Sequence, residues 1–350
     1  EARRHLLLPI PLEKHCMASL LARAPVVACV LAVCGRALLV QRSESHRTAA
    51  SFPVPEELPL PIAWLHTPKC GTSFANLLYR HHGICPQMPE NAVLRPGDQW
   101  SDFVKKHSVE GNCPGGFYGG FTGDHNGLGR DWLRIGGNHV FAFFRQPEQR
   151  LISGWLDHQH DWPIYFKAYH IREYAMHMSG CATRMLTRGG MPCGEPFGDP
   201  SPQELEVAVA RVKELGFVGL TEEWDLSVCL FHATYGGNCT DVDFMNIRPG
   251  RLRNGSAGYN VTAYLGRWTD PYDGRIYEEA SRVFWGRAAV LGVNRSSCKR
   301  FCKHVVKTVP FAKSRVDGKP KKSLRRKRRK DLLTFFSRDE HASAEMQVEG

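Results

Sequence analysis

One short segment, residues 65 to 74, combines residue types that bind a phosphate or sulfate ester. It reads Leu-His-Thr-Pro-Lys-Cys-Gly-Thr-Ser-Phe and follows an apolar run. We predict a strand, a tight loop and a helix whose first N–H groups are unpaired and lie at the positive end of the helix dipole. Gly71 lets the backbone approach an anion, Thr72 and Ser73 add hydroxyl donors, and Lys69 adds a mobile charge. The alternative is an ordinary strand-to-helix turn capped by Thr72.

A second segment, residues 141 to 155, places an arginine at the end of another apolar run. Arg145 can bind a phosphate through two parallel hydrogen bonds. Ser153 follows eight residues later, on the helix that the pattern predicts after Pro147. Arg150 lies between them and is equally well explained as a solvated helix residue. Together the two segments predict a ligand with two anionic groups.

These segments resemble motifs of the Golgi-type carbohydrate sulfotransferases, in particular those of the heparan sulfate 2-O-sulfotransferase kind. Residues 66–74 resemble the 5′-phosphosulfate loop, H-x-P-K-T-G-x-T-S/T-F, although one residue is missing between Lys69 and Thr72 and Cys70 replaces the usual Thr. Residues 145–153 resemble the 3′-phosphate motif, R-x-P-x-x-R-x-x-S. Residues 216–224 resemble the strand and turn that carry F-V-G-L-T-E. The three segments keep the family's order, and the resemblance spans residues 62 to 293.

The resemblance implies that the donor is 3′-phosphoadenosine 5′-phosphosulfate. In the family the loop lysine contacts the transferring sulfate, the loop backbone and hydroxyls hold the 5′-phosphate, and the arginine and serine hold the 3′-phosphate. Trp224 is either on the adenine side or a core aromatic residue. The expected donor-binding residues are Lys69, Cys70, Gly71, Thr72, Ser73, Phe74, Arg145, Ser153 and Thr221.

Transfer to a hydroxyl group also needs a base, and a neutral histidine suits this role. The chain has 16 histidines, so composition does not choose among them. The 2-O-type enzymes carry their catalytic histidine between the two donor motifs, which here implies His125 as the base, assisted by Lys69. Asp124 is then an orienting neighbour or an alternative base. The competing interpretation is that His125 is a loop residue without a role.

Other titratable residues are expected to contribute less. His66 precedes the donor loop and is expected to support it indirectly. His158 and His160 are interpreted as solvated residues at a helix end. A carboxylate base remains an alternative, with Glu195 as its candidate.

Two other classes of protein share some of these features. A nucleotide phosphotransferase needs G-x-x-x-x-G-K-[ST] and a metal-binding carboxylate at a strand end, and the sequence shows neither. A non-catalytic glycan- or heparin-binding protein on a degenerate sulfotransferase fold would use the basic run 313–330 as its ligand site. This run holds eleven Lys or Arg and accounts for the net charge of +11, so the charge does not indicate a nucleic-acid partner.

Alternating strands and helices must position these residues. We predict strands at 62–65, 139–144 and 217–220, and helices at 72–80, 147–158, 203–215, 224–233 and 274–293. Residues 85–137 are rich in Gly, Pro and Asn and are expected to be irregular with short helices. This order predicts an α/β protein of the P-loop-like sulfotransferase fold, with a central parallel β-sheet flanked by helices.

The ends of the chain predict a secretory protein. Residues 1–23 form a basic segment, 24–40 a signal anchor, signal peptide or core helix, 41–61 a Pro-rich stem, 62–311 the sulfotransferase domain and 312–350 a basic, disordered tail. We expect a single-pass type II Golgi membrane protein, or a secreted one, that acts on a glycan hydroxyl. The oligomeric state is left open.

Four glycosylation sequons and the cysteines after residue 40 agree with this prediction. The sequons begin at Asn238, Asn254, Asn260 and Asn294, and nine of the twelve cysteines follow residue 40. An oxidising compartment allows disulfide bonds among these nine, with at least one cysteine left unpaired. Cys298 and Cys302 are spaced for one helix face without being partners for that reason. No Cys or His cluster has the spacing of a structural zinc site, so no metal is predicted.

Overall fold

The computed structural model describes residues 55–161, 168–193, 198–249 and 258–302. Contacts divide the chain into residues 1–50 and 51–350, and all described residues belong to the second unit. The predicted membrane anchor, residues 24–40, the first part of the stem and the basic tail lie outside the described residues. Among the helices of the described part, none has the length and apolar character that a membrane crossing requires.

Three parallel strands form the sheet, in the order β1, β2, β3. They are β1 (Ala63–Leu65), β2 (Val140–Phe144) and β3 (Phe217–Leu220), and every residue in them is buried. Ala63 pairs with Val140, and Phe141 pairs with Phe217. Strands covered on both faces are apolar throughout, which is why all three were predicted to within one residue. The α/β class with a parallel sheet flanked by helices is confirmed.

Five helices correspond to the predicted ones: α1 (Phe74–Arg80), α5 (Pro147–Leu156), α8 (Pro202–Glu214), α9 (Trp224–Tyr235) and α11 (Asp273–Val290). Two of them start at a proline in the first turn, where a missing N–H costs nothing. The Gln146 side chain caps α5. Ser201 and Glu204 form a capping box at the start of α8.

The remaining helices are short. Three of them, α2 (Trp100–Lys106), α3 (Val109–Asn112) and α4 (Asp131–Ile135), lie in the region predicted to be irregular with short helices. Four were not predicted: α6 (Ile171–Met178), α7 (Cys181–Thr187), α10 (Val261–Leu265) and α12 (Arg295–Phe301). One or two turns give too little periodicity to separate such helices from a loop. Three 3₁₀ turns, η1 (Gly137–His139), η2 (Thr221–Glu223) and η3 (Asp241–Phe244), complete the set.

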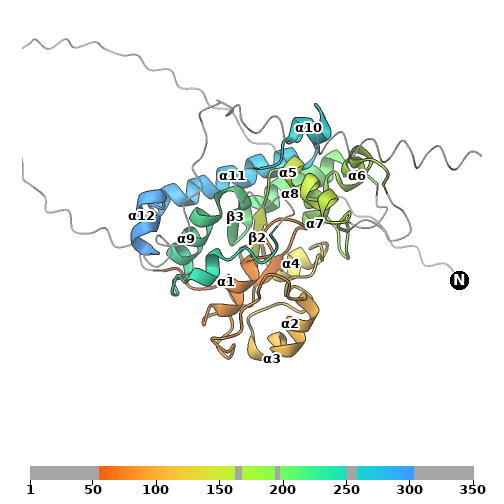
Figure 1. Cartoon of the computed structure of the whole chain (residues 1–350). Helices are drawn as coiled ribbons and strands as arrows, with labels where there is room; N and C mark the ends of the chain where they lie inside the picture. The colour runs from red at the N-terminus through yellow and green to blue at the C-terminus, as the bar shows by residue number, and fades with distance from the viewer. Residues whose placement is uncertain (1–54, 162–167, 194–197, 250–257, 303–350) are drawn as a thin grey trace, which may run out of the picture. The chain divides into compact units, whose positions relative to one another are not determined.

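An aromatic cluster joins one face of the sheet to α1 and α9. The ring of Phe74 lies 4.8 Å from that of Phe143 and 5.6 Å from that of Phe217, and Phe217 lies 5.3 Å from Phe231 of α9. Gly219 faces the Phe143 ring, where a Cβ atom would come within 2.6 Å of it. Helices α8 and α11 pack together on the other side of the sheet from α1 (Figure 1).

Four disulfide bonds lie in the described residues: Cys85–Cys113, Cys181–Cys193, Cys229–Cys298 and Cys239–Cys302. Cys298 lies in α12 and Cys302 directly follows it, and the two pair with different partners, a question that their spacing alone had left open. Cys70 is the unpaired cysteine among the described residues. This pattern is typical of a protein that folds in an oxidising compartment.

Three of the four sequon asparagines, Asn238, Asn260 and Asn294, are exposed, and Asn254 lies outside the described residues. Asn260 and Asn294 also cap α10 and α12 through their side-chain oxygens.

Candidate functional site

The loop between β1 and α1 forms a cradle of backbone N–H groups. Lys69 and Gly71 have positive φ angles of 64° and 91°, which turn the chain sharply. Within the turn, the Cys70 N–H donates to Thr67 O and the Phe74 N–H donates to Gly71 O. The N–H groups of residues 71 to 73 donate to no acceptor among the described residues. Such unpaired N–H groups beside a lysine are able to bind an anion.

Gly71 is required here by conformation and by space. A Cβ atom at this position would lie 2.9 Å from Cζ3 of Trp224. The Trp224 ring packs 4.7 Å from that of Phe143, and its Nε1 donates to Asp243 O. Trp224 is partly buried and packs against the loop at Gly71.

The side chains of the predicted donor loop divide into two groups. Phe74 packs in the aromatic core, and burial raises the pKa of the Cys70 thiol to about 12, so neither offers a polar group to a ligand. The Ser73 hydroxyl accepts a hydrogen bond from Ile247 N–H at 3.1 Å. The Thr72 hydroxyl lies 3.2 Å from Nε2 of His66. Lys69, Thr72 and the backbone are the parts that remain to meet a ligand.

Arg145 brings the second motif to the first. It follows β2 directly, and its Nη1 donates to Lys69 O at 3.3 Å while its guanidinium lies 5.6 Å from the centre of the Tyr259 ring. Thr221, from the third motif, donates to Phe144 O at 3.1 Å. Ser153 is buried on α5, and its hydroxyl has no hydrogen-bond partner in the described part of the chain. The three motifs thus meet at the carboxyl ends of the strands.

Arg150 has a structural place. Its Nη2 lies 3.3 Å from Oδ2 of Asp273 and donates to Met178 O at 2.9 Å. Both charged side chains are almost completely buried, with 3% of each exposed. Asp273 also accepts hydrogen bonds from the backbone N–H groups of Ala182 and Thr183. This burial fits neither a solvated helix residue nor a residue that contacts a ligand, the two roles that the sequence allowed for Arg150.

A group of histidines and aspartates lies beside the loop. Nδ1 of His125 is 2.9 Å from Oδ2 of Asp161, in a geometry that is not that of an aligned hydrogen bond. The His125 ring lies 4.8 Å from that of His66 and 5.3 Å from that of His160. Burial raises the pKa of Asp161, but the neighbouring His125 outweighs burial, so this pKa lies below its ordinary value. The pair is a histidine with a carboxylate on one side of its ring.

His66 is a neutral link between this group and the donor loop. It is buried, with Nδ1 2.6 Å from Gly123 O and Nε2 3.2 Å from the Thr72 hydroxyl. Burial, assisted by the nearby His125, lowers its pKa to about 3. His66 thereby connects the segment that carries His125 to the anion cradle, which agrees with the supporting position expected for it.

Two sequence-based expectations for this group are corrected by the geometry. Asp124 is exposed and makes no ion pair or hydrogen bond with His125 in the described residues, where Asp161 takes the neighbouring position instead. His160, interpreted as a solvated helix-end residue, packs its ring against His125. Glu195, the vaguest alternative base, lies outside the described residues.

Lys69 is paired with a carboxylate. Its Nζ donates to Oδ2 of Asp157 at 2.6 Å, and Nδ1 of His160 lies 3.7 Å from the same oxygen. Burial raises the pKa of Asp157, but the hydrogen bond from Lys69 outweighs it, so the carboxyl stays ionised. The Asp157 side chain is half exposed, so an incoming anion can exchange with it.

Unusual backbone conformations are concentrated in the same place. Five non-glycine residues of the described chain have positive φ, and four of them are Lys69, His158, Gln159 and Asp161. A non-glycine residue in this region costs on the order of 1 kcal/mol, and such residues cluster at functional sites. The segment 157–161 is therefore held in an unfavourable conformation beside Lys69 and His125.

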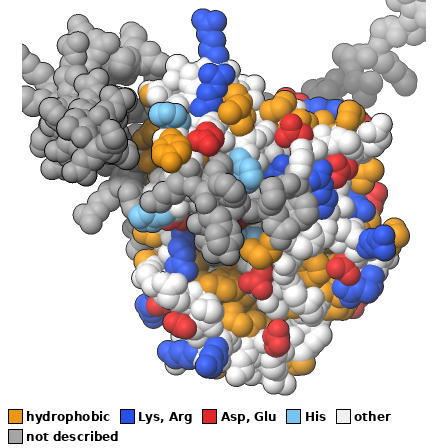
Figure 2. All heavy atoms as spheres, turned by 90° about the vertical axis from the view of Figure 1, so that its right-hand side faces the viewer, with side chains coloured by type: hydrophobic (Ala, Val, Ile, Leu, Met, Phe, Trp, Pro, Cys, Tyr) orange, Lys and Arg blue, Asp and Glu red, His pale blue; other side chains and the backbone are white. Residues whose placement is uncertain are grey.

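The residues that sequence reasoning missed are Asp157, His160 and Asp161. The run Asp-His-Gln-His-Asp at 157–161 is the signal that was available, because five polar residues with two carboxylates and two imidazoles end a helix there. Several histidine side chains reach the surface on the face shown in Figure 2, where acidic and basic side chains are mixed.

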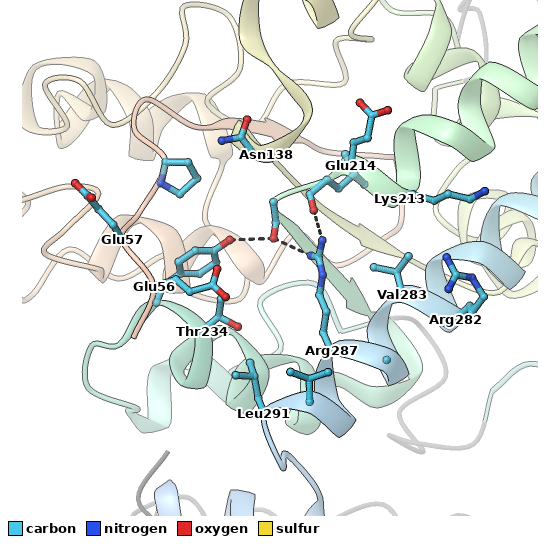
Figure 3. A pocket seen from close by; sticks show the side chains of 16 residues that line it. Glu56, Glu57, Asn138, Lys213, Glu214, Thr234, Arg282, Val283, Arg287 and Leu291 are labelled. Atoms are coloured by element: carbon cyan, nitrogen blue, oxygen red, sulfur yellow. Dashed lines mark hydrogen bonds between the residues drawn. The ribbon is translucent and has the colours of Figure 1, made fainter. Parts of the chain in front are cut away.

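A separate cavity of about 570 Å³ lies at the amino ends of the strands (Figure 3). Arg287 crosses it and donates to the carbonyl oxygens of Leu215 and Gly216, and the Tyr235 hydroxyl donates to Gly216 O. Three carboxylates, those of Glu56, Glu57 and Glu214, and the cations of Lys213 and Arg282 also line it. The lining therefore mixes both signs of charge.

Comparisons with known proteins give no further assignment: no family model matches the chain, and neither the curated proteins nor the solved structures include a match.

Proposed function

We propose that this protein is a sulfotransferase that transfers a sulfuryl group from 3′-phosphoadenosine 5′-phosphosulfate to a hydroxyl group of a glycan. One observation carries the proposal. Arg145 contacts the backbone of the Lys69 loop, and the His125–Asp161 pair lies at the same edge of the sheet. Two anion-binding groups and a base thus converge, which is what transfer from a donor with a 5′-phosphosulfate and a 3′-phosphate requires.

The chain's own groups match the parts of this donor. The unpaired N–H groups of residues 71 to 73 and the Thr72 hydroxyl suit the 5′-phosphate. Arg145 and the unpartnered Ser153 hydroxyl suit the 3′-phosphate. Thr221 extends this edge towards the nucleoside. The finer assignment to a P-loop-like sulfotransferase fold rests on the same match, because the loop follows the first strand and opens the first helix.

The His125–Asp161 pair supplies the base. A carboxylate beside Nδ1 favours the tautomer that carries its proton there, which leaves Nε2 free to accept one. Nε2 takes the proton of the acceptor hydroxyl group while the oxygen of that hydroxyl group bonds to sulfur. The bond between sulfur and the bridging phosphate oxygen breaks, and its electron pair stays on the phosphate. Lys69 stabilises the charge that develops on that oxygen.

Lys69 must leave Asp157 to perform this step. The two side chains are 2.6 Å apart, so the sulfate group of the donor competes with Asp157 for the ammonium group. We infer that donor binding and release of Asp157 occur together. This exchange avoids leaving a partly buried lysine charge without a partner.

A secretory location supports a glycan as the acceptor. Four disulfide bonds and three exposed sequon asparagines are consistent with folding in the secretory pathway. The proposal places the protein in the Golgi lumen, held by residues 24–40 as a membrane anchor or released as a secreted form.

Radiolabelled donor and a panel of glycan acceptors test the proposal. We expect transfer by the wild type, and a loss of about 100-fold or more in the His125→Ala variant, which lacks the base. Calorimetry with 3′-phosphoadenosine 5′-phosphate should show unchanged binding in this variant. Lys69→Ala should lose transfer, and Lys213→Ala, a change at the opposite edge of the sheet, serves as its control.

Undiminished transfer by Lys69→Ala would show that the donor loop is assigned wrongly. A wild type that binds no nucleotide but retains heparin would instead favour the non-catalytic glycan-binding alternative, in which the basic run 313–330 is the ligand site.

A further inference from the structure

Three side chains next to the donor loop have the arrangement of a metal-ion site. One nitrogen from each of His125 and His160 and one oxygen from Asp161 all lie within 4.8 Å of one another. Nδ1 of His125 is 2.9 Å from Oδ2 of Asp161, and Nε2 of His160 is 3.6 Å from Oδ1. Two imidazoles and a carboxylate are ligands that Zn²⁺ and similar ions prefer.

These distances match the size of such a site. Bonds of 2.0–2.2 Å from zinc to nitrogen or oxygen place two tetrahedral ligands about 3.4 Å apart. The observed 2.9 and 3.6 Å lie on either side of this value. The two distances involve different oxygens of Asp161, and the three ligand atoms lie within 4.8 Å of one another. Side-chain shifts on the order of 1 Å would bring them to the spacing of a tetrahedral site.

A second observation concerns the carboxylate itself. Oδ2 of Asp161 is buried, and Nδ1 of His125, 2.9 Å away, is not aligned with it as a hydrogen-bond donor within the described residues. An ion bound between the two atoms would satisfy this buried oxygen. Nδ1 of His160 also lies 3.7 Å from Oδ2 of Asp157. A carboxylate behind a ligating imidazole is the arrangement that orients metal-binding histidines.

The backbone of segment 157–161 serves this arrangement. Gln159 and Asp161 have φ angles of 57° and 62°, so the chain turns twice around His160. Neighbouring residues His160 and Asp161 are thereby able to approach the His125 ring together, which regular helix or strand would not allow for adjacent side chains. The unfavourable backbone conformation thus brings the potential ligands to one point.

Two other clusters of potential ligands do not qualify. Cys229, Cys298 and Cys302 are close together, but all three are in disulfide bonds and have no thiolate to offer. Cys239 is also in a disulfide bond, which leaves only His232 and Asp243 in the second cluster.

We propose that His125, His160 and Asp161 form a binding site for a divalent transition-metal ion of the Zn²⁺ type, with further positions open to solvent or ligand. Asp157 orients His160 from behind. One consequence rests on the proposed function: a bound ion occupies His125 and prevents it from acting as a base. Metal binding and sulfuryl transfer would then exclude each other.

Binding of Zn²⁺ and Co²⁺ to the full chain, with its disulfides intact and without a histidine tag, tests the site directly. Calorimetry should give one strong Zn²⁺ site per chain, and Co²⁺ should give the visible absorption of a low-coordinate complex. His160→Ala and Asp161→Asn should weaken binding at least tenfold. His158→Ala, a change within the same segment outside the three ligands, should bind as the wild type does.

Absence of strong binding in the wild type, or equal binding in the His160→Ala and Asp161→Asn variants, overturns the proposal. Binding of 3′-phosphoadenosine 5′-phosphate and the circular dichroism spectrum show whether each variant is folded, and a misfolded Asp161→Asn leaves His160→Ala to decide. No donor or acceptor is needed. A chain that binds Zn²⁺ here but transfers no sulfate after the metal has been removed by a chelator would keep the metal site and refute the proposed function.

Discussion

At the scale of single residues, the cradle of N–H groups at residues 71 to 73 depends on the absence of a side chain at Gly71. Its φ of 91° and the Trp224 ring below it both exclude a side chain. The N–H groups of residues 71 to 73 have no acceptor among the described residues, and the loop that carries them packs closely on that ring. Gly97 has the same kind of backbone, with φ of 95°, but no atom lies within 4 Å of its missing Cβ. Substitutions at the two glycines therefore distinguish the cost of a positive φ angle from the cost of a steric clash.

We therefore expect Gly71→Ala to abolish nucleotide binding and to destabilise the protein more than Gly97→Ala does. Positive φ alone costs an alanine about 1–2 kcal/mol, and both variants should show this loss. Only Gly71→Ala adds displacement of Trp224. Urea unfolding measures the stabilities, and calorimetry with 3′-phosphoadenosine 5′-phosphate measures binding. Equal effects of the two substitutions on binding would contradict the cradle.

At the scale of elements, one carboxylate joins three helices. Asp273 opens α11, receives Arg150 from α5, and accepts the N–H groups of Ala182 and Thr183 at the start of α7. Arg145, five residues before Arg150, faces the donor loop instead. Two arginines of one motif therefore have different surroundings: Arg150 holds α5 in place, whereas the proposed function assigns Arg145 to nucleotide binding.

This division predicts opposite results for two similar substitutions. Arg150→Met should destabilise the protein by about 3–5 kcal/mol, because it leaves the Asp273 charge buried without its partner. Arg145→Met should change stability by no more than about 0.5 kcal/mol and should weaken nucleotide binding at least tenfold. Chemical denaturation and calorimetry measure the two properties. The assignment fails if Arg145→Met unfolds the protein while Arg150→Met leaves its stability intact.

His81, which directly follows α1, makes the stability of the folded protein depend on pH. It is buried, and burial, assisted by His232, lowers its pKa below the ordinary 6.5. The unfolded chain therefore binds a proton more readily than the folded one. Stability from this group is present above pH 6.5 and is lost as the pH falls below it, by at most about 1.4 kcal/mol per pH unit.

His81→Gln should flatten the loss of stability between pH 7 and pH 5, as measured by urea unfolding at several pH values. His82→Gln is the control, since the neighbouring His82 is exposed and its removal should leave the slope unchanged. Parallel curves for His81→Gln and the wild type would show that His81 is protonated equally in both states.

Sequence patterns predicted elements where packing leaves a strong signal. The strand 217–220 was predicted at its observed bounds, because a strand covered on both faces is apolar at each position. Helices α6 and α7 were not predicted: α6 has eight residues and α7 has seven, and α7 is held through Asp273 of distant α11. Contacts of this kind depend on tertiary structure, which a local pattern does not contain.

The candidate site shows the same limit. Lys69 and Arg145 stand at ends of predicted strands, so their meeting follows from parallel strands sharing an edge. His125 was chosen from a resemblance, and its partner Asp161 was missed because 36 residues and several turns separate them. The positive φ angles of segment 157–161 bring Asp161 back to the site, and the residue types do not predict these angles.

At the scale of the whole molecule, two disulfides fasten α12 to the rest of the fold. Cys229–Cys298 spans 69 residues and Cys239–Cys302 spans 63. Each closes a loop large enough to contribute about 2–4 kcal/mol. Sγ of Cys229 also lies only 3.6 Å from Sγ of Cys302, so the two bonds are neighbours in space. A free thiol at Cys302 would find a disulfide sulfur within reach.

We predict that Cys239→Ser yields a mixture of disulfide isomers. The Cys302 thiolate attacks the Cys229 sulfur, a Cys229–Cys302 bond forms, and Cys298 leaves as the thiolate. Peptide mapping by mass spectrometry under non-reducing conditions would identify both forms. The reciprocal variant Cys302→Ser frees Cys239, which lies outside the close sulfur group, and should keep Cys229–Cys298 alone. A single pairing in both variants would contradict the exchange.

The left-handed residues at 69, 158, 159 and 161 also bear on how this gene can vary. Val, Ile and Thr fit such backbone angles worst, whereas Asn, Asp and Gly fit them best. Codons at His158 and Gln159 are therefore restricted by shape even where their side chains do no chemistry. In a saturating library selected only for folded protein, these two positions should be depleted of β-branched residues, so part of the site would be visible before any substrate is known.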